Sequence, residues 1–117
     1  MNEVKSLKPY NLLYSNTSST KIGSLPANSI ITDIKVLVGT AFNAGNTDYL
    51  DIGDSEDADE FAANIDLSST GKATVTMTEI GAVESTSNPT DIYVIYTGSG
   101  TAPSAGSAYI IVEYVQI

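Results

Sequence analysis

The sequence predicts an all-β protein, an antiparallel β-sandwich of jelly-roll type with one short helix near residues 55–64. Three observations support this fold class. Apolar residues recur with a period of two rather than 3.6. Turn-forming segments separate the extended runs at short intervals, at 43–46, 68–71, 86–89 and 98–106. The chain has 117 residues, of which 42% are apolar, and this is enough for one domain with an ordinary core.

The clearest predicted strand spans Ile30 to Phe42, after a turn at residues 25–29 in which Pro26 fixes the backbone. Its even positions form an apolar face and its odd positions are more polar. The even positions are Ile30, Thr32, Ile34, Val36, Val38, Thr40 and Phe42. A second strand is predicted over 72–80, with Ala73, Val75 and Met77 on the apolar face and threonines opposite. Shorter strands are predicted at 10–14, 21–25 and 49–52.

Two later strands, at 91–97 and 107–117, are apolar on both faces. Tyr93 and Ile95 lie opposite Ile92, Val94 and Tyr96, and the last strand shows the same double pattern. A sandwich covers only one face of each sheet, so the second faces need another cover. Loops and the N-terminal segment could supply it, but we favour contact with another subunit, because contiguous apolar patches mark interfaces. The loop at 98–106 is predicted to be a flexible hairpin tip between these two strands.

The predicted helix spans residues 55–64. Asp54 or Ser55 could cap it, and acidic residues in its first turns suit the helix dipole. Ala58, Phe61, Ala62 and Ile65 follow the spacing of one apolar helix face.

Composition excludes several kinds of chemistry. The chain has no cysteine, no histidine and no arginine, with 5 lysines against 14 acids. Without histidine a Ser-His-Asp triad is impossible, and without cysteine there are no disulfides and no usual structural zinc site. A Ser-Lys pair and a pair of carboxylates for glycoside hydrolysis stay formally open without supporting spacing. We therefore assign no catalytic residue, no metal ligand and no cofactor.

The net charge of −9 argues against nucleic acid as a partner. No apolar run approaches the length of a membrane span, and the first residues lack the order of a signal peptide, so we expect neither a membrane partner nor export by that route. Eight acids fall between Asp48 and Asp66 and could attract calcium, but they do not match a calcium-loop signature. Helix capping and solubility explain the same residues more simply, so we favour them over a calcium site.

The charge is divided unevenly along the chain. Residues 1–32 carry a net +2, from Lys5, Lys8 and Lys21 against Glu3, and residues 33–117 carry −11. We interpret residues 1–24 as an N-terminal arm with a first short strand and residues 25–117 as the sandwich domain. The arm could dock on an acidic partner, although solvated surface charge is an equally simple reading.

Several segments together resemble small virion structural proteins of tailed bacteriophages, including head decoration proteins and β-rich domains of head or tail fibres. The likeness covers roughly residues 25–115. It is carried by the Leu25–Asp33 turn and strand, by Val38–Gly45, by Tyr49–Asp54, by Ile65–Gly71 and by the 98–106 loop with Ala108–Tyr114. These are strand and turn patterns rather than a chemical signature.

The resemblance implies a non-enzymatic protein of the virion surface, assembled in the host cytoplasm, often as a trimer. We expect a capsid decoration or cement protein whose partners are the major capsid protein or other virion proteins, and further copies of itself. The alternative is a receptor- or carbohydrate-binding module of a fibre, with loops 43–48 and 98–106 as its contact surface. The expected partner-binding residues are Lys5, Lys8, Tyr10, Tyr93, Ile95, Tyr109, Ile111 and Val115.

Overall fold

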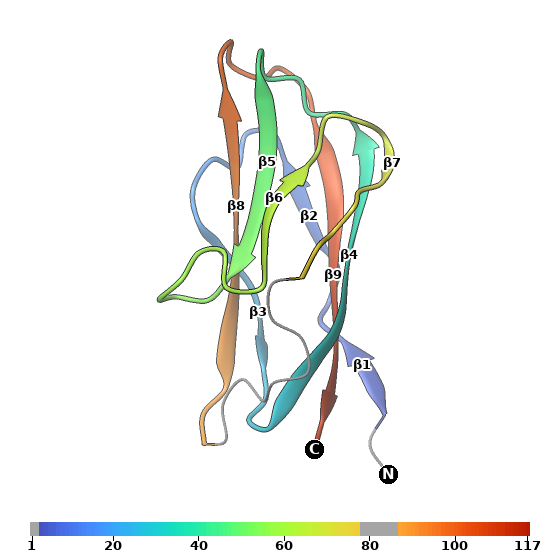
Figure 1. Ribbon diagram of the computed structural model, residues 1–117, viewed down its shortest axis with the longest axis vertical. Coiled ribbons are helices and arrows are strands. Elements are labelled where there is room, and N and C mark those ends of the chain that lie inside the picture. Colours follow the sequence, from blue (N-terminus) through green and yellow to red (C-terminus); the bar gives the residue numbers. More distant parts are fainter. Residues whose placement is uncertain (1–2, 78–86) are drawn as a thin grey trace.

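The computed structural model describes residues 3–77 and 87–117, and within these residues the chain is a β-sandwich without a helix (Figure 1). All strand pairs are antiparallel. The molecule is elongated, 46 × 26 × 20 Å. The first sheet contains β1 (Val4–Ser6), β2 (Tyr10–Leu13), β4 (Ser29–Thr40), β7 (Gly71–Lys72) and β9 (Ser107–Gln116). The second sheet contains β3 (Thr20–Leu25), β5 (Thr47–Gly53), β6 (Ala62–Asp66) and β8 (Thr90–Ser99).

The strand order is that of a jelly roll. The first sheet has the order β1-β9-β4-β7, with β2 also paired to β9, and the second has the order β3-β8-β5-β6. Consecutive strands change sheets at every connection except β1–β2 and β5–β6. The predicted fold class is therefore confirmed. The 98–106 loop is not a hairpin, because β8 and β9 lie in opposite sheets.

The N-terminal residues are part of the sandwich. β1 and β2 lie one after the other along the side of β9 that faces away from β4, and they form one interrupted edge strand. Within the interruption, the Leu7 amide donates to the Val112 carbonyl at 2.9 Å. Leu7 and Leu12 are buried, and Leu7 packs closely on Gly23 of β3. The segment expected to be an arm therefore supplies core side chains.

The core lies between the two sheets. The inward positions of β9 alternate along the strand as the sequence predicted, and those of β8 do the same. The largest fully buried side chains are Tyr96, Phe42, Phe61, Leu12, Leu25, Ile31, Leu50, Ile52, Ile65, Leu67, Ile92 and Ile110.

The buried side of β4 changes phase at the first of two irregularities in its pairing with β9. A bulge between Ile31 and Asp33 leaves Thr32 without a partner on β9, since Ile31 pairs with Tyr114 and Asp33 with Glu113. Ile31 and Ile34 are buried, whereas Thr32 is exposed. The predicted even-numbered face is wrong before this bulge and right for Ile34, Val36 and Val38 after it, whereas Thr40, beyond the second irregularity, is exposed.

The predicted helix at 55–64 is wrong. Residues 54–61 form the β5–β6 connection, in which the Asp54 carboxylate accepts hydrogen bonds from the amides of Glu56 (2.9 Å) and Asp57 (2.8 Å). The Asp54 amide in turn donates to the Asp57 carbonyl at 3.0 Å, which closes a tight turn. A side chain that satisfies local amides in this way competes with the helix. Residues 62–66 then form β6, paired with β5.

The predicted strand at 72–80 is present only in part. β7 covers two residues, and Ala62 bridges Met77 in the other sheet, so residues 73–77 cross from the first sheet to the second. Ala73, Val75 and Met77 pack against the core while the intervening threonines are exposed, so the predicted alternation is right. Residues 78–80 lie outside the described residues.

Candidate interaction surface

The outer face of the first sheet is built by the odd-numbered residues of β9 and their neighbours. Tyr109 pairs with Leu37 of β4, and Leu37 pairs on its other side with Lys72 of β7. Because paired residues point to the same side of a sheet, these three side chains form a row across the outer face. At the other end of the face, Val115 pairs with both Ile30 and Val4. We call this surface the apolar face.

Exposed apolar side chains are concentrated there. Among the described residues, seven large hydrophobic side chains are exposed, and five of them belong to strands of the first sheet or directly follow β9. The five are Val4 (62% exposed), Leu13 (42%), Leu37 (40%), Tyr109 (51%) and Ile117 (60%). Burying apolar surface of this kind stabilises a complex by roughly 25 cal/mol per Å² before association costs. The distribution therefore marks the first sheet as the side that gains most from contact.

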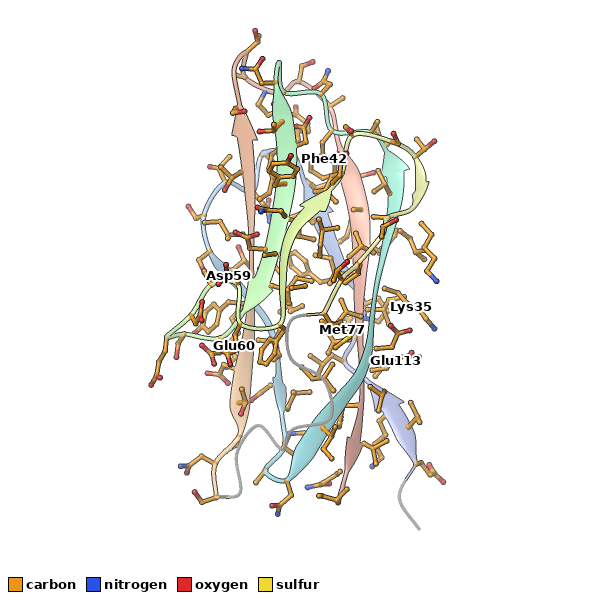
Figure 2. All side chains as sticks on the ribbon, in the orientation of Figure 1. Lys35, Phe42, Asp59, Glu60, Met77 and Glu113 are labelled. Carbon is orange, nitrogen blue, oxygen red and sulfur yellow. The ribbon has the colours of Figure 1, made fainter. Side chains whose placement is uncertain are left out.

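The charge of the first sheet is mildly positive. With the β1–β2 connection included, Lys5, Lys8, Lys35 and Lys72 stand against Asp33 and Glu113, a net +2. Lys35 and Glu113 form an ion pair of 3.2 Å on the apolar face, and Figure 2 shows both projecting on that side of the molecule.

The outer face of the second sheet is acidic. Asp51 of β5, Asp66 of β6 and Asp91 of β8 occupy outward positions, and we call this surface the acidic face. Its one lysine, Lys21, pairs with Asp91 at 3.3 Å. With buried Asp48 and the five acids of residues 54–60, the strands and hairpin loop of this sheet carry a net −8. Figure 2 shows Asp59 and Glu60 on the side opposite Lys35 and Glu113.

The hydrogen bonds of the acidic loop are mostly internal. A hydrogen bond with Asp59 lowers the pKa of Asp57, and the same contact raises the pKa of Asp59. Hydrogen bonds from the Ser68 hydroxyl and amide hold the pKa of Asp66 below its ordinary value. In the part of the chain that the structure describes, no three acidic side chains are grouped so that they could hold a metal ion.

The sequence-predicted contact residues fall on three parts of the fold. Tyr109, Ile111 and Val115 come together on the apolar face, as β9 alternation predicted. Tyr93 and Ile95 are half-buried on the outer side of β8, in the opposite sheet.

The three N-terminal contact residues lie on the β1–β2 edge. Lys5 and Lys8 are exposed, and Lys5 pairs with Tyr114, which places it on the other side of the sheet from Val4. Tyr10 is half-buried against the core, and its hydroxyl accepts a hydrogen bond of 2.6 Å from the Asn16 amide group. The structure therefore does not bring these three together with Tyr109.

The residues expected from the sequence to make contact did not include several members of this surface, among them Val4, Leu13, Leu37 and Lys72. Leu37 stands at an odd position of a strand whose even positions are predicted to face the core, so alternation alone assigns it to the outer face. The neighbours that make it part of a row are distant in sequence.

A second candidate surface lies at one end of the sandwich, where the 43–48 and 98–106 loops meet. The Asn43 side-chain oxygen accepts hydrogen bonds from the amides of Ser104 (2.8 Å) and Ala105 (3.0 Å), and its amide group donates to the Ser104 hydroxyl (3.0 Å). The Gly45 amide donates to the Thr101 carbonyl at 2.9 Å. The two loops are thus fixed to one another.

Asp48 of β5 connects these loops to the core through its side-chain hydrogen bonds. It is 3% exposed, and its carboxylate accepts hydrogen bonds from the Tyr96 hydroxyl at 2.6 Å and from the Ala44 amide at 3.0 Å. Burial, together with this carboxylate, raises the pKa of Tyr96 far above its ordinary value. The Tyr96 ring packs on Phe42 with centroids 4.8 Å apart.

The fold and its surfaces define a jelly-roll β-sandwich with one apolar outer face and one acidic outer face. The fold is similar to that of a chain in the cyanophage Pam1 capsid asymmetric unit, with a TM-score of 0.74 and 18% identity over 99% of this chain and 86% of that chain. It is also similar to a chain of the acid-stable capsid of Helicobacter pylori bacteriophage KHP30, with a TM-score of 0.59 and 14% identity over 98% and 93% of the two chains. At these identities the likeness shows a shared fold. No protein-family model and no curated protein sequence matches the chain.

No helix among residues 3–77 and 87–117 has the length and apolar character needed to cross a membrane.

Proposed function

We propose that this chain is a non-enzymatic structural protein of a phage virion, and specifically a capsid decoration or cement protein that binds the outside of the capsid and stabilises it. The observation that carries the proposal is the similarity of the fold, over nearly the whole chain, to chains of two phage capsid structures. Its partners are the major capsid protein or other virion proteins, and its place is the virion surface.

The two unlike faces support this proposal. A protein that attaches to a large shell needs one side that favours contact and another that stays hydrated. The apolar face meets the first requirement and the acidic face the second, since exposed acids promote solubility. A protein that binds only the assembled shell stabilises it by about 2.7 kcal/mol per site when its free concentration is a hundredfold above Kd.

The direct test adds the purified protein to capsids of its phage that lack it. We expect saturable co-sedimentation and a rise in the temperature at which the capsids open. Immunolabelling of intact virions should mark the head surface. Absence of co-sedimentation at tens of micromolar protein, together with unlabelled heads, would overturn the proposal.

The N-terminal lysines can be tested without truncation. Deleting residues 1–20 would remove buried Leu7 and Leu12 and so confuse binding with folding. The double variant Lys5→Glu/Lys8→Glu changes only exposed charge, and we expect slower capsid binding with a weaker dependence on salt. Lys21→Glu, on the acidic side, is the matched control. Equal association rates for all three proteins would exclude the lysine edge from docking.

Self-association follows from the same proposal, with a trimer favoured. Size-exclusion chromatography with light scattering measures it directly. A strict monomer at micromolar concentration, both free and when released from capsids, would refute a stable homo-oligomer.

A receptor- or carbohydrate-binding module of a fibre is the second candidate, favoured by the ordered contact between the 43–48 and 98–106 loops. Glycan-array binding that is lost in Asn43→Ala would support this alternative. Glycan binding unaffected by that variant would place recognition elsewhere on the molecule.

A further inference from the structure

The two outer faces of the sandwich are not equivalent as docking surfaces. We propose that the apolar face around Leu37 and Tyr109 is the surface that contacts the capsid, and that its occupant is a protein surface with an apolar centre bordered by carboxylates. This inference rests on the proposed function and assigns the contact to one of the two faces.

Apolar exposure is the first argument. Leu37 is 40% exposed and Tyr109 is 51% exposed, and they are paired neighbours on β4 and β9. Half-buried Ile111 extends this centre along β9, beside Lys35. On the acidic face the corresponding apolar residues of β8, Tyr93 and Ile95, are already half-buried, and each stands opposite a residue of charged or small character on β5. The apolar face therefore has more unburied surface to lose on contact.

Charge is the second argument, and it also defines the occupant. Lys72 borders the apolar centre and forms no ion pair among the residues that the structure describes, whereas Lys35 is paired with Glu113. A carboxylate on the partner would complement Lys72 at this border. The opposite side carries a net −8, so it would repel the same acidic rim. Attachment through the first sheet leaves that side in solvent.

A second copy of the chain is the competing occupant. Two apolar faces packed on each other would bring together two surfaces on which the charges of Lys35 and Lys72 are balanced by Asp33 and Glu113. The strands of such a face supply no carboxylate rim beyond those two acids. The acidic face of another copy would supply one. The two occupants are separable because only one of them changes the oligomeric state of the free protein.

The experiment measures capsid affinity for paired variants of the full chain. Tyr109→Ser on the apolar face is matched by Tyr49→Ser, an exposed strand tyrosine of the second sheet. Lys72→Glu is matched by Glu56→Lys in the acidic loop. Each variant is first checked for an unchanged melting temperature, and Leu37→Ser replaces Tyr109→Ser if the latter fails to fold.

We expect Tyr109→Ser and Lys72→Glu each to weaken capsid binding at least tenfold, and Lys72→Glu to reduce its salt dependence. Both controls should stay within twofold of the wild type. Weakening by Tyr49→Ser with Tyr109→Ser unchanged would overturn the inference while leaving the proposed function intact. Dissociation of a free oligomer by Tyr109→Ser with unchanged capsid affinity would assign the face to a second copy instead. If the wild type itself does not bind capsids, the proposed function fails, and the inference fails with it.

Discussion

The buried hydrogen bond between Tyr96 and Asp48 gives a prediction with two independent readouts. Tyr96→Phe keeps the ring and its packing on Phe42 but removes the hydroxyl that donates to the Asp48 carboxylate at 2.6 Å. The carboxylate would retain the Ala44 amide as a donor but would stay buried, at 3% exposure. The variant therefore leaves a buried charge with fewer hydrogen bonds rather than creating a cavity.

The magnitude follows from the type of bond that is lost. A hydrogen bond to a charged group contributes about 1.5–3 kcal/mol, and its loss inside the protein lies in the upper part of that range. We expect the free energy of unfolding at pH 7 to fall by about 2–3 kcal/mol. For a domain of this size the melting temperature should fall by roughly 4 °C for each kcal/mol.

The second readout is the dependence of stability on alkaline pH. Burial and the Asp48 carboxylate raise the pKa of Tyr96 above its ordinary value of 10.0. The folded protein thus keeps this proton at a pH where the unfolded chain has released it. The contribution of the protonated Tyr96 hydroxyl to the free energy of unfolding is complete below pH 10. It is lost as the pH rises further, by roughly 1.4 kcal/mol per pH unit. Tyr96→Phe has no such proton, so the stability gap between the two proteins should close between pH 10 and pH 12.

Urea unfolding followed by circular dichroism at pH 7, 10, 11 and 12 measures both readouts. Tyr49→Phe, an exposed tyrosine on the same sheet, is the control and should change stability by less than about 0.5 kcal/mol. A gap between wild type and Tyr96→Phe that stays constant from pH 7 to pH 12 would refute the assignment of the alkaline loss to this pair.

Two further predictions concern the same end of the sandwich. Asn43→Ala should speed hydrogen exchange at the amides of Ser104 and Ala105 and lower the free energy of unfolding by about 1 kcal/mol. Asn43→Asp keeps the acceptor oxygen and should protect both amides, so equal exchange rates in the two variants would contradict the prediction. Gly106→Ala would place a Cβ 2.6 Å from the Phe42 ring and should destabilise the fold by about 1–3 kcal/mol in thermal melts. Gly39→Ala is the control and should be nearly neutral, because its Cβ would lie 3.5 Å from the nearest atom. Similar melting temperatures for the two variants would show that the Phe42 ring moves freely.

Alternation along single strands was the part of the fold that could be predicted. Six predicted strands are present, and the inward and outward positions of β8 and β9 are as expected, because a period of two is a local property of an extended chain. The bulge at Thr32 could not be predicted in this way. It exists because β4 pairs with β9, which lies far away in sequence, and only that pairing leaves one residue over.

The false helix shows how two local signals can compete. Phe61, Ala62 and Ile65 are buried but Ala58 is exposed, so the pattern identified three of the four residues that it assigned to the core. Their geometry was wrong because Asp54 binds the amides that would begin the helix, and because Gly53 lies so close to the Asp57 carbonyl that the chain must fold back on β5. Helical spacing of a few apolar residues is a weak signal beside such a turn.

Only part of the apolar face could be predicted from the sequence. Tyr109, Ile111 and Val115 followed from β9 alone, but Leu37 and Lys72 join them only through sheet pairing. The charge asymmetry also separates the two sheets of the sandwich, since the first sheet carries a net +2 and the second a net −8. Residues close in sequence, such as Lys21 and Lys5, thus end on opposite sheets.

The position of β9 in the first sheet has a consequence for the order of folding. This strand pairs with β1, β2 and β4, all of which lie in the first forty residues, so it joins early and late parts of the chain. Such non-local pairings close long loops and form slowly. During synthesis, β1, β2 and β4 have no central strand to pair with until residues 107–116 emerge. The apolar face, whose middle row is β9, is therefore completed last, and a partial chain without residues 107–116 would lack this face.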